Sequence, residues 1–388
     1  RKNWQDMQVK TVQHGVGDRG AKSRVTGDTV CGPETLSEDE LVKNRENMWA
    51  EILSRPLDGP YYGERTADLG KVTVPLLSSA NWGGQGLHTR GNFEGFARAA
   101  SKDKWLEVHG GSHWAPFYTD YGVKLQKRFF DHFLKGTANG WDRQPRVLLN
   151  VRHPGEKFVP RAENEWPLAR TRWAHFYLDP DGMRLSSVPA AVDGAVTYEA
   201  TGDGVTFSTS PLENDTEITG PSALKLFISS STTDTDIFAV LRVFDPKGSE
   251  VLFQGALDPK TPVGQGWLRA SQRKIDPERS LPYRPWHSHD EKQPLKLGEI
   301  VGIDVEIWPT CIVVPAGYRV ALTIRGRDYE HDGAAATLSN MKNPMRGCGP
   351  FTHDDPTDRP PAEFGGRVTL HFGPGWQSSV LLPVIPPR

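Results

Sequence analysis

Residues 72–80 have the sequence VTVPLLSSA, a short apolar run rich in residues that favour β-structure. Such a run predicts a buried strand. Residues 104–109, KWLEVH, predict a second strand, and a helix is expected after each strand, over 92–100 and 121–134. The order strand, helix, strand, helix is typical of a parallel sheet. Because this pattern covers only about 65 residues, it is too short for a complete α/β domain.

The segment before this pattern differs from it. Residues 1–33 are polar and are expected to be irregular. Ser37 and Glu40 have the spacing of a capping box, which predicts a helix that continues over 41–53 and ends before Pro56.

Beyond Trp173 the sequence changes to short apolar stretches separated by turn signals such as DPKG at 245–248. The strands that we expect here are 173–178, 223–229, 237–244, 299–307, 317–325, 366–372 and 378–384. This succession is typical of an antiparallel β-sandwich, whose boundary with the α/β part falls between residues 150 and 173. Residues 334–362 are rich in Gly, Pro and Asp and predict a long loop.

The composition argues against several classes of protein. A length of 388 residues suggests two or three domains. The 46 Lys and Arg residues nearly balance the 48 Asp and Glu residues, whereas a nucleic-acid-binding protein usually carries a basic excess. No stretch approaches the length of about 18 apolar residues that a membrane span requires. Cys31, Cys311 and Cys348 are too widely spaced to suggest a disulfide framework or a four-ligand zinc site.

Each expected strand of the α/β part is followed by a loop that contains a histidine. His88 ends the loop NWGGQGLH, and His113 lies in the loop GGSHW. Ligands of open parallel sheets bind at the carboxyl ends of the strands, and a histidine there can act as a general base. For His113, an ordinary loop histidine is an equally good interpretation. For His88, it is the favoured interpretation.

A hydrolase that uses a catalytic histidine also needs a nucleophile. The strand-to-helix turn G-x-S-x-G, which exposes a nucleophilic serine, does not occur in this sequence. The residues GGSH at 110–113 match its first half, but Trp114 stands at the position of the last glycine, and no helix is expected to start there. Ser112 is therefore not expected to be the nucleophile.

Metal signals in the sequence are weak. The residues HSHD at 287–290 form a compact cluster, but no HExxH or CxxC motif accompanies them, so a polar loop is the favoured interpretation. The residues DTD at 234–236 could bind a cation at the start of an apolar strand, but hydrogen bonding between loop and strand is favoured. We therefore expect no metal and no cofactor.

Several segments together resemble the C-terminal half of a known hydrolase family. They are PLDGPYYGERTADLGKVTVPLL at 56–77, SANWGGQGLHTRGNFEGF at 79–96, the histidine loop and following helix at 105–136 and, in the sandwich, 234–244, 266–273 and 317–325. In order and spacing they are similar to the CocE/NonD family, which includes cocaine esterase, α-amino-acid ester hydrolases and X-Pro dipeptidyl-peptidases. The likeness runs through nearly all of the 388 residues.

The resemblance implies an α/β plus all-β fold in three parts. Residues 1–70 would be a remnant of the family's helical cap, and residues 71–160 the C-terminal part of an α/β-hydrolase domain. Residues 161–388 would form a jelly-roll β-sandwich of the galactose-binding-like kind. In the family, this jelly roll packs on the hydrolase domain and helps to close the acyl pocket.

The resemblance also implies a serine hydrolase that cleaves an ester or amide of an acyl or peptidyl substrate through an acyl-enzyme. His113 falls on the family's catalytic histidine, which takes the serine proton and passes it to the leaving group. The family's serine and oxyanion tyrosine precede the cap, so they would lie outside this chain. We therefore expect the chain, which starts at Arg1, to be a fragment that acts as a hydrolase when the full-length protein is intact. Its expected partners are the small-molecule substrate and the missing N-terminal half, and a homo-oligomer stays open.

The orienting acid of the family has no counterpart at its usual position. It lies two residues after the tryptophan of the first loop, where this sequence has Gly84. Glu94, Asp103 and Asp120 are near in sequence, but nothing in the sequence selects one of them. Asn81 could instead orient His113 as an amide.

Two other functions stay open. Without a serine and an acid at the usual places, the chain could be a non-catalytic pseudoenzyme or a binding module that uses its jelly roll for carbohydrate or another chain. A metal-dependent enzyme built on residues 287–290 is the third hypothesis. Few cysteines and no visible signal peptide favour the cytoplasm, but a missing N-terminus could have carried a signal, so the localisation stays unknown.

Overall fold

The computed structural model describes residues 22–29, 37–43, 46–338, 344–349 and 351–387. The chain forms two compact units, residues 1–61 and residues 62–388, which we describe separately. Among the described residues, no helix is both long and apolar enough to cross a membrane.

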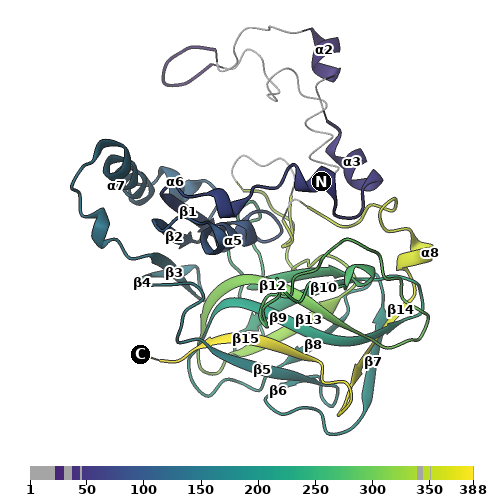
Figure 1. The fold of residues 1–388 in the computed structure, drawn as a ribbon. Coiled ribbons are helices and arrows are strands. Elements are labelled where there is room, and N and C mark those ends of the chain that lie inside the picture. Colours follow the sequence, from purple (N-terminus) through teal and green to yellow (C-terminus); the bar gives the residue numbers. More distant parts are fainter. Residues whose placement is uncertain (1–21, 30–36, 44–45, 339–343, 350, 388) are drawn as a thin grey trace. The chain divides into compact units, whose positions relative to one another are not determined.

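The first unit contains two short helices where the sequence predicted one. Helix α2 spans Glu38–Lys43 and helix α3 spans Met48–Ser54 (Figure 1). The prediction of one continuous helix was wrong because Asn47 caps a second helix: its side-chain oxygen accepts a hydrogen bond from the Ala50 N–H at 3.1 Å. Helix α3 ends before Pro56, as expected. Most of the segment 1–33 lies outside the described residues.

The predicted capping box is confirmed. The Ser37 N–H donates to Glu40 Oε2 at 2.9 Å, and the Glu40 N–H donates to Ser37 Oγ at 3.4 Å. A further single turn, α4 (Pro60–Gly63), follows where the two units join in sequence.

The second unit begins with a small α/β sheet. Strands β1 (Leu76–Asn81) and β2 (Lys104–His109) pair in parallel, as predicted. Strand β3 (Val147–His153) is parallel to β2, and β4 (Lys157–Glu163) returns antiparallel, which gives the order β1-β2-β3-β4. Strand β1 starts after Pro75, later than expected, because proline has no N–H to donate to the ladder.

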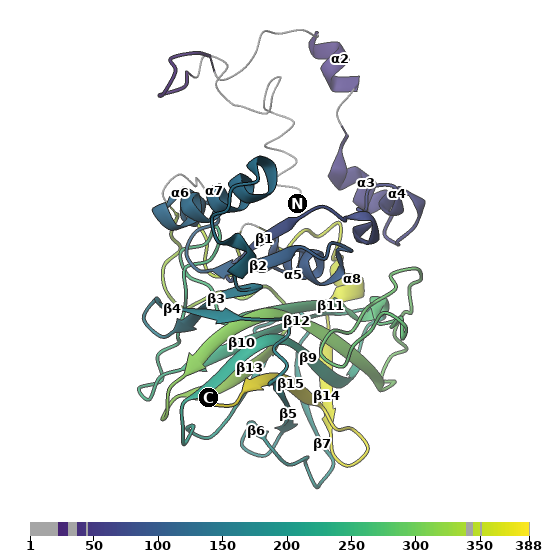
Figure 2. The ribbon, with the colours of Figure 1, turned by 60° about the vertical axis from the view of Figure 1, so that its left-hand side comes forward.

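Helices cover both faces of this sheet (Figures 1 and 2). Helix α5 (Thr89–Arg98) packs Phe93 and Phe96 against one face, whereas α6 (Ala115–Tyr118) and α7 (Asp120–Lys135) lie on the other, where Phe129 of α7 meets Trp105 of β2. The prediction that no helix starts after Trp114 was wrong, since α6 begins at Ala115 and has a proline in its first turn, where proline is favoured. Two 3₁₀ turns, η2 (Leu69–Lys71) and η3 (Trp141–Arg143), flank the sheet in sequence.

The rest of the described second unit is dominated by one large sheet. Its strands are β5 (Arg172–Asp179), β6 (Arg184–Ser186), β7 (Gly194–Glu199), β8 (Val205–Ser208), β9 (Thr216–Ser230), β10 (Asp236–Phe244), β11 (Gly264–Arg269), β12 (Val301–Val314), β13 (Arg319–Arg325), β14 (Arg367–Phe372) and β15 (Ser379–Ile385). Hydrogen bonding runs in the order β12-β11-β10-β13-β8-β6-β5-β15-β9, and β9 pairs again with β12. Nine of the described strands thus close into a barrel-like ring, which β14 and β7 extend from β9.

The seven strands expected beyond Trp173 are all present, as β5, β9, β10, β12, β13, β14 and β15. The expected antiparallel sandwich is corrected in its detail: the sheet is closed, and β6 and β8 form a parallel pair. The sequence did not indicate β6, β7, β8 and β11, which are short or glycine-containing and therefore carry little alternation. In the region of the expected long loop, the described residues form turns and an isolated bridge between Ala336 and Met345, followed by the single turn α8 (Pro361–Phe364).

A buried arginine joins the two sheets. Arg152 of β3 is 1% exposed, and its guanidinium donates to the carbonyl oxygens of Cys311 (2.7 Å) and Val263 (2.9 Å) and to the Thr310 hydroxyl. Its charged plane also lies over the Phe253 ring, 4.5 Å from the centroid. Burial lowers the pKa of Arg152 to about 10, so it still carries its charge at neutral pH.

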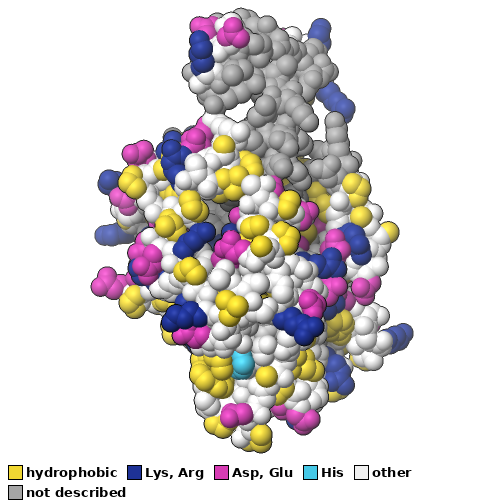
Figure 3. Space-filling model, turned by 90° about the vertical axis from the view of Figure 1, so that its right-hand side faces the viewer, with side chains coloured by type: hydrophobic (Ala, Val, Ile, Leu, Met, Phe, Trp, Pro, Cys, Tyr) yellow, Lys and Arg dark blue, Asp and Glu magenta, His cyan; other side chains and the backbone are white. Residues whose placement is uncertain are grey.

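Charged side chains of both signs are interspersed on the face drawn in Figure 3. This mixture agrees with the near-balance of acidic and basic residues in the sequence.

Candidate active site

Two loops meet at the carboxyl ends of β1 and β2. The Asn81 side chain links them: its Nδ2 donates to the Gly111 carbonyl at 2.8 Å, and its Oδ1 accepts from the Gly83 N–H at 2.8 Å. Asn81 therefore fixes the backbone of the histidine loop. The sequence suggested that its amide could orient the ring of His113, but the two side chains form no hydrogen bond in the structure.

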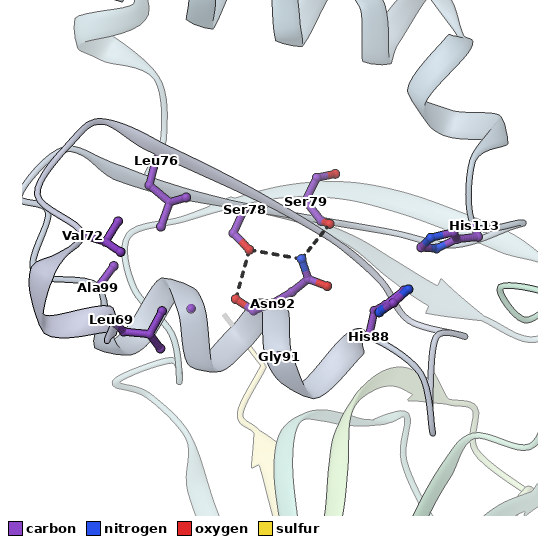
Figure 4. A pocket seen from close by; sticks show the side chains of 11 residues that line it. Leu69, Val72, Leu76, Ser78, Ser79, His88, Gly91, Asn92, Ala99 and His113 are labelled. Carbon is purple, nitrogen blue, oxygen red and sulfur yellow. Dashed lines mark hydrogen bonds between the residues drawn. The ribbon is translucent and has the colours of Figure 1, made fainter. Parts of the chain in front are cut away.

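A groove of about 470 Å³ runs from these loops along β1 and α5 (Figure 4). His88 and His113 stand at one end of it, and Leu69, Val72 and Ala99 line the other. Between them, Ser78 Oγ donates to the Asn92 carbonyl at 3.0 Å. The groove thus combines an apolar wall with two imidazoles, which suits an organic ligand with one reacting polar group.

The rings of His88 and His113 are in contact, with centroids 5.0 Å apart and planes inclined by 31°. Partial burial lowers the pKa of His113, and the neighbouring His88 and His109 lower it further. His113 is thereby kept unprotonated at neutral pH, which is the state that a general base requires.

The carboxylates suggested by the sequence do not reach His113. Glu94 pairs with Arg284 at 2.6 Å, Asp103 faces Arg146 at 3.9 Å, and Asp120 lies in the first turn of α7. Among the described residues, no carboxylate forms a hydrogen bond or ion pair with the His113 ring.

Gly84 leaves no room for the acid that the family resemblance places there. A Cβ at this position would come within 2.8 Å of Thr89 Oγ1 and 3.3 Å of the Asn81 carbonyl. The Thr89 hydroxyl is fully buried and donates to that same carbonyl at 2.7 Å, so it cannot move aside without losing its partner.

A carboxylate and a histidine that the sequence did not single out lie side by side on β2. Glu107 is 1% exposed, and its Oε2 contacts His109 Nδ1 at 2.8 Å and accepts from the Ser79 hydroxyl at 2.6 Å. The Tyr121 hydroxyl donates to Oε1 at 3.4 Å, and burial together with this carboxylate raises the pKa of Tyr121. The two-residue spacing of Glu107 and His109 could have revealed them, because residues i and i+2 of a strand share a face.

The metal hypothesis gains no support. In the parts of the chain that the structure describes, no three His, Cys, Asp or Glu side chains are arranged to hold a metal ion. Asp290 pairs with Lys274 at 2.8 Å, and burial lowers the pKa of His287 to about 4. Asp234 accepts from the N–H groups of Thr235 and Ser271 at 2.9 Å each, so it bonds within its own loop and to the 3₁₀ turn η4 (Ala270–Gln272) rather than to a strand.

Comparison with known proteins gives the family. Residues 139–381 match the X-Pro dipeptidyl-peptidase C-terminal non-catalytic domain. This chain belongs to that family. The match begins before β3 and includes nearly all of the large closed sheet.

Relatives confirm the resemblance to CocE/NonD hydrolases. The structure of a CocE/NonD family hydrolase from Staphylococcus aureus superposes with a TM-score of 0.79 at 29% identity, covering 88% of this chain and 59% of that one. Cocaine esterase of Rhodococcus sp. (strain MB1 Bresler) is 27% identical over 53% of this chain and 38% of its own length. A protein of Mycobacterium tuberculosis (strain CDC 1551 / Oshkosh) that carries a serine-esterase name is 26% identical over 56% and 38%, respectively. The chain thus spans well under half of the curated relatives that it matches.

A loop of the C-terminal domain holds the histidine loop. The His113 N–H donates to the Ala256 carbonyl at 2.8 Å, and the Ala256 N–H donates to the Gly83 carbonyl at 3.0 Å. Nearby, Asp258 is 1% exposed, and its Oδ2 accepts from the N–H groups of Gly347 (2.7 Å) and Gly349 (3.1 Å). The domain of this family therefore contributes directly to the geometry around His113.

Proposed function

We propose that this chain is part of a serine hydrolase that cleaves an ester or amide through an acyl-enzyme. His113 is the general base, and the nucleophilic serine lies outside this chain. The observation that carries the proposal is the position of His113: it follows a parallel strand, lies at the end of a groove and has a lowered pKa, in a chain similar to CocE/NonD hydrolases.

In the proposed reaction, one ring nitrogen of His113 accepts the serine proton as the oxygen attacks the acyl carbon. The same nitrogen then gives this proton to the leaving alcohol or amine. A water molecule deprotonated by His113 releases the acyl group and regenerates the serine. The apolar wall of the groove fits a small-molecule substrate.

The proposal assigns a role to three parts of the chain. Residues 1–70 would be the remnant of a cap, 71–160 the C-terminal part of an α/β-hydrolase domain, and 161–388 a jelly roll. Within the described residues, β1 pairs only with β2, so one edge of the small sheet has unpaired backbone groups. An N-terminal hydrolase half would cover this edge with a further strand and would bring the serine.

A fluorophosphonate probe, which labels activated serines, tests the proposal. We would add the probe to the purified protein and measure intact masses under denaturing conditions. We expect a label on a longer chain or on a second polypeptide, with none on a His113→Ala variant. A wild-type protein that takes no label and hydrolyses no ester would contradict the proposal.

Two observations favour a second candidate, a non-catalytic binding module. The matched family is described as a non-catalytic domain, and no described carboxylate reaches His113. In that case the closed sheet would bind carbohydrate or another chain. Titration with a panel of glycans and with the N-terminal half of a related hydrolase tests it, and binding to neither would exclude it.

A further inference from the structure

We propose that His88 is the positioning residue of His113 and takes the role that an acid plays in a serine, histidine, acid triad. This inference rests on the proposed function. It starts from the ring contact, with centroids 5.0 Å apart, and from the fact that both rings line the same groove (Figure 4). His88 also comes from the loop after β1, the loop in which the family resemblance placed the acid.

The turn around Gly84 fixes the position of His88. The Gly84 carbonyl accepts hydrogen bonds from the N–H groups of Leu87 (3.0 Å) and His88 (2.9 Å). His88 is also the N-cap residue of α5, and its carbonyl accepts from the Asn92 N–H at 3.2 Å. Backbone bonds on both sides of His88 thus fix its main chain at the point from which its ring contacts His113.

An imidazole has the chemistry that this role needs. A neutral histidine offers one unprotonated ring nitrogen as an acceptor. When one nitrogen of His113 takes the serine proton, its other N–H donates to the unprotonated nitrogen of His88. No proton needs to leave His113 for this, so His88 only holds the ring in place. In the structure the two rings are in contact but form no hydrogen bond. Catalytic hydrogen bonds are often long or poorly aligned before substrate binds and form fully in the complex.

Within the described parts of the chain, the His113 ring contacts an imidazole and forms no hydrogen bond or ion pair with a carboxylate. His88 and His109 are the two ionisable groups that act on its charge. Glu107, on the strand that leads into the histidine loop, is buried and already bonded to His109, Ser79 and Tyr121. A partner without negative charge stabilises the protonated form of His113 less than an aspartate would.

Substitution of His88 tests the inference. The substitutions are made in the full-length protein that the fluorophosphonate probe labels. We expect His88→Ala to lower kcat/KM for a p-nitrophenyl ester by about 10²-fold, a magnitude typical of acid–base machinery. His88→Asp should retain more activity than His88→Ala and should move the acidic limb of the kcat/KM profile to higher pH, because a carboxylate raises the pKa of His113. His175→Gln, in β5 of the large sheet, is the matched control and should behave as wild type.

A second measurement separates this inference from the proposed function. NMR titration of the imidazole signals gives the pKa of His113 without any need for activity, and it also shows that each variant is folded. A raised His113 pKa in His88→Asp supports the coupling of the two rings. Wild-type kinetics in both His88 variants, or an unchanged His113 pKa in His88→Asp, would overturn the inference, whereas an inactive wild type with coupled rings would contradict only the proposed function.

Discussion

The backbone N–H of His113 donates to the carbonyl of Ala256 at 2.8 Å, across 143 positions of sequence. The histidine loop belongs to the small sheet, and Ala256 belongs to a loop of the large closed sheet. This backbone hydrogen bond holds the two loops together, so a shift of one loop is expected to move the other. The site and the C-terminal domain are therefore one structure, which leads to the first prediction.

Adding a methyl group between these loops should destabilise the protein. A Cβ at Gly83 would collide with the Gly255 backbone, and neither backbone can move without breaking the bond between Gly83 and Ala256. We expect Gly83→Ala to lower the free energy of unfolding by about 1–3 kcal/mol, the usual cost of overpacking. Urea denaturation measures this. Gly91→Ala on α5, where a Cβ meets nothing within 4 Å, is the control and should be neutral or stabilising.

Substitution of Arg152, the buried arginine that joins the two sheets, should lower the free energy of unfolding by more than Gly83→Ala does. Arg152→Met removes the buried donor of the Cys311 carbonyl and of the Thr310 oxygen, whereas the Val263 carbonyl keeps its hydrogen bond from the Thr310 hydroxyl. We expect a loss of about 3 kcal/mol or more in the free energy of unfolding, since each stranded buried group costs about 1–3 kcal/mol. Arg184→Met is the comparison, because Arg184 is largely exposed and its ion pair with Asp179 contributes little. Equal effects of the two substitutions in guanidinium denaturation would contradict this account.

Glu107 should prove to stabilise the fold through its buried hydrogen bonds. Glu107→Gln keeps the size of the side chain but replaces an acceptor by an amide donor that faces the Ser79 and His109 donors. We expect the free energy of unfolding to fall by about 1–3 kcal/mol. The exposed Glu278→Gln serves as the control and should change stability little. Unchanged stability of Glu107→Gln at pH 7 would show that the buried carboxylate is not needed.

The acid sensitivity of the fold should depend partly on His287. Burial lowers its pKa in the folded state to about 4, from an unfolded value near 6.5. Between these pH values the unfolded chain binds the extra proton, so this group's contribution to stability is present above pH 6.5 and is lost as the pH falls towards 4. We expect His287→Gln to show a smaller loss of thermal stability than wild type between pH 7 and pH 4.5, with His175→Gln as the control. An identical pH dependence in wild type and His287→Gln would refute this.

The sequence predicted the elements that have strong local signals. The apolar run before Asn81, the strand segment KWLEVH and the helical spacing of apolar residues in 121–134 depend on near neighbours only, and the corresponding elements are present. By contrast, the three-residue β6 and the glycine-containing β11 have too little pattern to be recognised from sequence, and they form because neighbouring strands pair with them.

The site was predictable to a smaller extent. The rule that ligands bind at the carboxyl ends of parallel strands was enough to select the two loops that contain His88 and His113. The contact of Ala256 with His113 and the contact of His88 with His113 depend on tertiary packing, which no local motif encodes. Whether His113 acts as a base stays a prediction.

The tight packing around Gly84 means that an aspartate at this position requires more than one substitution. The new Cβ would meet the buried Thr89 hydroxyl, so a viable Gly84→Asp chain would first need a smaller residue at 89. That first change alone removes the hydrogen bond to the Asn81 carbonyl and loosens the start of α5. Each single substitution is therefore unfavourable without the other, and a chain that has adopted this turn is held to a solution without an acid at residue 84.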